Sequence, residues 1–175
     1  LFGLPHGATD HMLSNFTKSK ALSGRVTIPF ISMYLTIILV YAGIWYYSPE
    51  VGLLIFLLMS AYHFGETQWI GAEVQTHNVI LVRAQHFSWG VLLLSTLFVV
   101  HETDTLSFLS GLIDSEIAAA SVTVTTWWVW PFSFFLTGLL SAVIYQGNTL
   151  LLQLAEFVAL IVLFFMTELI FAFSI

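Results

Sequence analysis

Cysteine is absent from the sequence, and charged side chains are scarce. Without cysteine the chain can form no disulfide, no thiolate metal site and no cysteine nucleophile. Only 8% of the residues are charged, against roughly 25% in a typical soluble domain, so we expect lipid rather than water around much of the chain. Four residues are basic. Nucleic-acid binding needs clustered cations to neutralise phosphates, so this function is excluded.

Apolar residues make up 58% of the sequence. A helix that crosses a bilayer needs about 20 mainly apolar residues, and long apolar runs meet this need. The runs cover residues 26–47, 51–69, 79–100, 127–145 and 150–175. We therefore expect an all-α, polytopic transmembrane helix bundle of about five spans plus a partial N-terminal helix. It would form a single membrane domain over residues 1–175, multi-pass in the cell membrane.

Charge and chain ends refine this organisation. Lys18, Lys20 and Arg25 share one short loop, which the positive-inside rule places in the cytoplasm. Residues 104–113 predict a short helix at the membrane surface, which Gly111 weakens. The sequence begins without methionine and stops within an apolar run, so we expect a fragment that is truncated at both ends.

Ionisable side chains inside a bilayer are costly, so each is a functional hypothesis. The first group lies near the start of the chain, where Pro5 and Gly7 flank His6. Asp10 lies one helical turn from His6, where its carboxylate could receive the free ring N–H of a metal-bound imidazole. His11 points about 100° away from Asp10 around a helix.

The second group lies in the apolar run 51–69. Ser60, His63 and Thr67 follow the i, i+3, i+7 spacing of one helical face, and Glu66 lies beside them. We expect this polar stripe to face protein or a cavity, because lipid offers it no hydrogen-bonding partner.

Histidines from three segments reach a similar depth. Counted from the side of the 18–25 loop at the rise of a regular helix, His6, His63 and His86 lie roughly 9–12 Å into the membrane. Arg83 lies one turn from His86 on the same face. This geometry is compatible with one intramembrane site built from converging imidazoles. A ligand set of imidazoles suits iron, copper or zinc, and the spacing does not choose among them.

Simpler roles compete with metal binding. A lone histidine in a membrane helix often serves packing through a hydrogen bond, and His6 or His63 alone could do so. The pairing of His86 with Arg83 favours an interfacial or packing role for His86 over metal binding. His77 and His101 lie at the ends of predicted spans, where we expect solvent.

Two segments resemble the signatures of a known family, the Brp/Blh family of membrane β-carotene 15,15′-dioxygenases. Residues 3–11 read Gly-Leu-Pro-His-Gly-Ala-Thr-Asp-His and resemble its signature G-L-P-H-G-A-x-D-H. Residues 60–66 read Ser-Ala-Tyr-His-Phe-Gly-Glu and resemble its second signature, S-A-x-H-F-G-E. The order and separation of the two segments are also similar to those of the family.

The resemblance implies that O₂ cleaves the central double bond of β-carotene at an Fe(2+) site, giving two molecules of retinal. It places His6 and His63 on iron-ligand positions, with His11 and His86 as further candidates. Asp10 and Glu66 are candidates to orient the ligands, and no other catalytic residue is expected. The family's remaining ligands lie in a C-terminal W-H-S-x-R-H-like segment that this sequence lacks, so we expect the fragment itself to be inactive.

Other functions compete with the oxygenase interpretation. The main alternative is an intramembrane ion or small-molecule transporter, in which buried His, Arg and Glu side chains form a path. A di-iron desaturase or hydroxylase needs several histidines at short spacings. A retinal-binding photoreceptor needs an intramembrane lysine, and Lys18 and Lys20 lie in a polar loop. A non-catalytic assembly subunit remains open.

Overall fold

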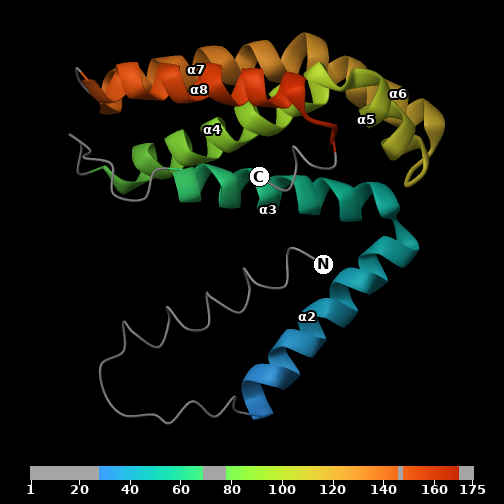
Figure 1. Ribbon diagram of the computed structural model, residues 1–175. Helices are drawn as coiled ribbons and strands as arrows, with labels where there is room; N and C mark the ends of the chain where they lie inside the picture. Colours follow the sequence, from blue (N-terminus) through green and yellow to red (C-terminus); the bar gives the residue numbers. More distant parts are fainter. Residues whose placement is uncertain (1–27, 69–77, 146–147, 170–175) are drawn as a thin grey trace. The chain divides into compact units, whose positions relative to one another are not determined.

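A computed structural model describes residues 28–68, 78–145 and 148–169, and the elements in these residues are helices (Figure 1). The all-α expectation is therefore confirmed for the described part of the chain. In order, the helices are α2 (Ile28–Tyr47), α3 (Pro49–Gln68), α4 (Val79–Val100), α5 (Glu102–Ser110), α6 (Ser115–Val124), the π-helix η1 (Thr125–Val129), α7 (Trp130–Ile144) and α8 (Asn148–Met166).

The chain divides into two compact units, and the boundary falls inside α2. Among the described residues, those up to Gly43 belong to the first unit and those from Ile44 onward belong to the second. In the first unit the described residues belong to α2, whose side chains from 32 to 40 are all exposed and mostly apolar. The expectation of one membrane domain over residues 1–175 stays a prediction.

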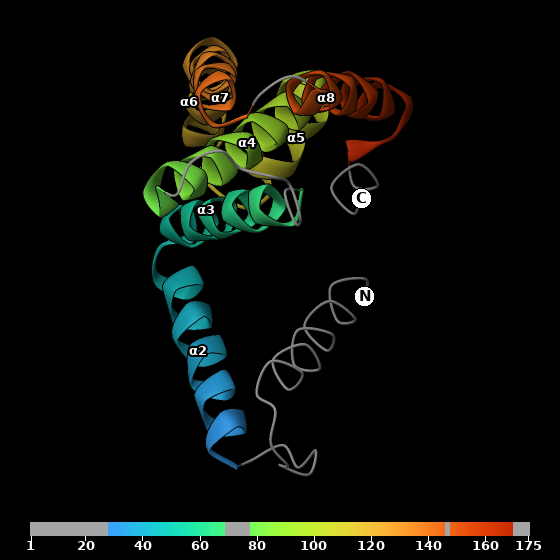
Figure 2. The ribbon, with the colours of Figure 1, turned by 90° about the vertical axis from the view of Figure 1, so that its left-hand side faces the viewer.

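Helix α4 is the centre of the second unit and packs against α3, α7 and α8 (Figures 1 and 2). It begins where Asn78 caps it: the Asn78 side-chain oxygen accepts from the backbone N–H groups of Ile80 at 3.0 Å and Leu81 at 3.3 Å. Such a cap satisfies amides that have no partner within the helix. The bounds Val79–Val100 are those that the apolar run predicted.

Helices α3 and α4 cross at two glycines. A Cβ atom on Gly65 would overlap the backbone carbonyl oxygen of His86, and a Cβ on Gly90 would overlap that of Ala61. Only glycine permits backbones to approach this closely, as small residues do at helix crossings in membranes. The crossing therefore fixes which face of α3 is covered by α4.

Polar side chains join α4 to α7. The pairs run in opposite order along the two helices, so the helices are antiparallel. Such contacts provide interhelical hydrogen bonds in an otherwise apolar bundle. They are Gln85 Nε2 to Ser141 Oγ at 2.6 Å, Ser95 Oγ to Ser133 Oγ at 3.4 Å, and Trp130 Nε1 to Thr96 Oγ1 at 3.0 Å.

Two helices among the described residues are long and apolar enough to cross a membrane, Val79–Val100 and Ser115–Ile144. Ser32–Tyr47 and Leu151–Met166 are shorter apolar helices. The expected bundle of about five spans is thus not confirmed. The surface helix expected at 104–113 is α5, which ends at Ser110, directly before Gly111. The apolar run from 150 is helical to Met166, and residues 170–175 lie outside the description.

The helix Ser115–Ile144 continues through a proline. The prediction that it begins at residue 127 was wrong, because α6 leads into α7 without a break. Pro131 has no N–H to donate to the carbonyl four residues earlier. In the turn before it, Trp130 donates its backbone N–H to Thr125, five residues back, which is the bond of a π-helix.

Candidate functional site

His63 lies on the side of α3 that faces away from α4. Ala61 and Gly65 form the contact with α4. At 100° per residue, His63 is therefore about 180° from this contact around the helix axis. Its side chain is exposed, and its ring centroid lies 6.1 Å from that of Phe64. Any group that joins His63 at a metal would have to approach α3 from the side opposite α4.

The polar stripe around His63 stays partly open. Ser60 is half-buried, Glu66 is exposed, and the side chain of Thr67 lies outside the description. The buried positions nearby are Ala61 and Gly65. The stripe thus lies away from the α3–α4 contact, and the expectation that it faces protein or a cavity stays a prediction.

His86 belongs to the α3–α4 crossing. Its backbone carbonyl contacts Gly65, and its half-buried side chain lies close enough to Glu66 for an electrostatic interaction. Arg83, one turn earlier, is exposed. His63 points to the opposite side of α3, so this arrangement offers no support for His63 and His86 in one ligand set.

A metal centre is not complete within the described residues, where no three His, Cys, Asp or Glu side chains form a group that could hold a metal. His6, Asp10 and His11 lie outside the description. The donor chemistry is suitable for iron, because neutral imidazole is a common iron ligand and no thiolate competes. The assignment of His6 and His63 as ligands stays a prediction.

An apolar cavity lies between α3 and α5, and we call it the α3–α5 cavity. Its volume is about 300 Å³, and Thr105 is the one polar residue among those that line it. An adjoining space of about 120 Å³ shares five of its lining residues. The cavity is lined by Leu53, Phe56 and Leu57 of α3, Phe98 of α4, Thr105, Phe108 and Leu109 of α5, and Leu169.

Phe56, one of three α3 residues that line the α3–α5 cavity, shares a face of α3 with His63, whereas Leu53 and Leu57 lie about 80° and about 120° from His63 around the helix axis. Phe56 lines the cavity and precedes His63 by seven residues. Seven residues bring a helix to within about 20° of the same direction, about 10 Å along its axis. An apolar molecule that extends from the cavity along this face would therefore approach the His63 ring.

Buried charge is missing from the part of the chain that the structure describes. The buried polar side chains there are Ser, Thr and Gln, and the described Arg, Asp and Glu side chains are half-buried or exposed, as are His63 and His86. A path of buried ionisable groups, as a transporter would need, thus has no support in these residues.

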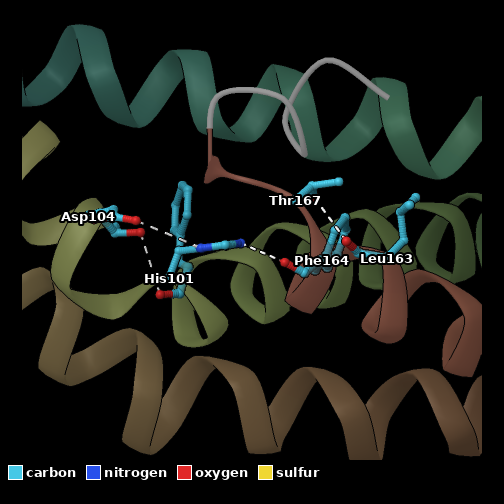
Figure 3. Close-up of polar contacts among 7 residues, drawn as sticks. His101, Asp104, Leu163, Phe164 and Thr167 are labelled. Carbon is cyan, nitrogen blue, oxygen red and sulfur yellow. Dashed lines mark hydrogen bonds and ion pairs between the residues drawn. The ribbon is translucent and has the colours of Figure 1, made fainter.

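The expectation that His101 is solvated was wrong. Its side chain is only 12% exposed, and its Nε2 atom lies 2.8 Å from the carbonyl oxygen of Phe164 (Figure 3). Its Nδ1 atom lies 3.9 Å from Oδ2 of Asp104. The position of His101 at the end of an apolar run gave no sign of this contact, because α8 is distant in sequence.

The comparisons with known proteins identify a family. The family model described as "Beta-carotene 15,15′-dioxygenase" matches residues 1–175. A curated protein of that name from an uncultured marine bacterium, 66A03, is 41% identical over 63 residues. This match covers 36% of the present chain and 23% of that relative, so it spans about a quarter of the relative's length. No solved structure matches the chain.

Proposed function

The chain belongs to the β-carotene 15,15′-dioxygenase family, and on this basis we propose that the full-length protein cleaves β-carotene at its central double bond with O₂ at a non-haem iron site, yielding two molecules of retinal. The family match extends over all 175 residues, which supports action on carotenoids. The curated relative is matched over only 23% of its length, so it supports the family rather than the details of the reaction.

The proposed setting is the cell membrane, with several helices crossing the bilayer. Val79–Val100 and Ser115–Ile144 support this, because both are long and apolar enough to span. β-Carotene is a hydrocarbon and partitions into the bilayer, so an enzyme embedded there meets its substrate without extracting it into water.

His6 and His63 are the proposed Fe(2+) ligands, completed by further ligands of the full-length protein, and His11 is an additional candidate. The metal would supply the activation of O₂, which protein side chains cannot provide. His63 would present its ring from the face of α3 opposite α4. Asp10 and Glu66 would receive ring N–H groups and orient the ligands.

The α3–α5 cavity is the observation that carries the substrate assignment. Its lining is almost wholly apolar and includes Phe56, on the same face of α3 as His63. A polyene has no polar group, so its binding depends on apolar contact and on the exclusion of water. Part of the carotenoid would occupy the cavity, and the chain beyond it would pass His63.

The test is retinal formation by the full-length protein in membranes supplied with β-carotene. His63→Ala should lower retinal yield by about 100-fold or more and lower bound iron, because it removes a ligand from the metal. His77→Ala is the matched control, since the sequence places this histidine outside the site, and it should retain both. Equal yields from unmodified protein and His63→Ala would contradict the proposal. An iron-free full-length protein would favour the transporter alternative.

A further inference from the structure

His101 lies where three helices meet. It ends α4, precedes α5, and reaches the last turn of α8 with its ring (Figure 3). Its backbone N–H donates to the carbonyl of Leu97 at 3.1 Å, and its own carbonyl accepts from Thr105 N–H at 2.8 Å. The backbone of His101 is therefore held from both sides, and the direction of its ring is set by the α4–α5 joint.

The ring contact satisfies a carbonyl at the C-terminal end of α8. Helix α8 ends at Met166, so the carbonyl of Phe164 has no amide four residues ahead within the helix. A carbonyl oxygen can only accept, so His101 Nε2 carries the hydrogen in the 2.8 Å contact. Asp104 lies on the other side of the ring, with its Oδ2 atom 3.9 Å from Nδ1.

This contact joins the walls of the α3–α5 cavity. Leu169 lines the cavity five residues after Phe164, and it packs against the buried cluster of Leu97 and Phe164. Thr105, one turn after His101, lines the cavity from α5. The His101 ring thus connects the joint that carries one wall to the helix end that leads to another.

We propose that His101 is a positioning residue for this cavity: its Nε2–H holds the last turn of α8 in place, and thereby keeps Leu169 in the cavity wall. Loss of the donor frees the end of α8 and opens the cavity on the Leu169 side. The identity of the occupant as a carotenoid rests on the proposed function. The positioning role of His101 rests only on the contacts of His101, Phe164 and Leu169.

The experiment measures access to position 169 in the full-length protein. Leu169→Cys introduces a reporter thiol, and its reaction with a water-soluble maleimide is followed by peptide mass spectrometry. His101→Asn and His101→Gln differ by one methylene, and only the Gln amide nitrogen reaches the position of Nε2. We expect labelling on the order of tenfold faster in the Asn variant, since a helix-end hydrogen bond is lost, and within about twofold of the unmodified rate in the Gln variant.

Thr167→Val is the matched control. It removes a hydrogen bond of the same turn, from Thr167 Oγ1 to the Leu163 carbonyl at 2.9 Å, and leaves the His101 donor in place. Its labelling rate should stay within about twofold of the unmodified rate. His101→Phe keeps the ring and removes the donor, so it replaces the Asn variant if that does not fold. Unchanged labelling in both donor-free variants would overturn the proposal, as would equal acceleration by His101→Gln or Thr167→Val. Labelling needs no β-carotene, so failure of the proposed reaction would appear separately, as absent retinal in unmodified protein.

Discussion

Replacing Gly65 with alanine should destabilise the protein, although alanine is the better helix former. The new Cβ would overlap the backbone carbonyl oxygen of His86, and it would lie 2.5 Å from the carbonyl carbon of His86. Backbone cannot rotate aside as a flexible side chain can, so α3 and α4 have to separate. Overpacking of this kind costs about 3 kcal/mol, at the upper end of its usual range.

The higher helix propensity of alanine offsets about 1 kcal/mol of this loss in stability. The net loss is therefore about 2 kcal/mol, or roughly a 30-fold change in the folding equilibrium. Gly138→Ala, in α7, is the matched control: it lies in a helix of the same unit, and nothing lies within 4 Å of its added Cβ. That variant should be unchanged or more stable by up to about 1 kcal/mol.

The assay is unfolding of the full-length protein in detergent micelles by denaturant titration, with both variants measured beside the unmodified protein. Retinal formation is measured in parallel, and Gly65→Ala should lower it because α3 carries His63. Equal stability of Gly65→Ala and Gly138→Ala would refute the reasoning, since it would mean that α3 and α4 do not meet closely at Gly65.

Two further predictions concern the cavity and the start of α4. Phe56→Trp should lower the rate of carotenoid cleavage several-fold without loss of iron, because the larger ring fills part of a cavity of about 300 Å³. Phe135→Trp, at a position 70% exposed on α7, is the control. Equal effects of the two substitutions on the cleavage rate would contradict the cavity assignment. Asn78→Ala should cost about 1 kcal/mol in unfolding free energy through loss of the α4 cap, whereas Asn78→Asp keeps the acceptor and should cost little; a harmless Ala variant would show that the cap does not contribute.

Segment 60–66 contains both residues that pack against α4 and a candidate metal ligand, His63. Ala61 and Gly65 lie in the part that resembles the family signature, and in the structure both serve the close contact with α4. His63 points the other way. The spacing of Ser60, His63 and Thr67 correctly placed them on a helix, but a helical periodicity cannot say which face another helix covers.

Helix boundaries were predictable where local signals were strong. The run 79–100 is long and mainly apolar despite Arg83, Gln85 and His86, and its bounds agree with α4. The cap by Asn78 was found only in the structure. Residues 115–126 contain polar and small side chains and were not predicted to be helical, yet they continue into α7. Their apolar positions, such as the buried Ala118 and Val122, find partners across the fold in Leu53 and Leu109, and a short window of sequence does not contain that information.

By itself the sequence determined that the chain is helical and apolar, and that His63 lies within α3, because these properties follow from composition and from periodicity along a few turns. Tertiary structure alone decided that α4 covers the face opposite His63, that Phe56 opens onto a cavity, and that His101 is nearly buried against α8. Those outcomes depend on contacts between residues far apart in the chain, such as His101 and Phe164, and such contacts leave no pattern in the local order of residues.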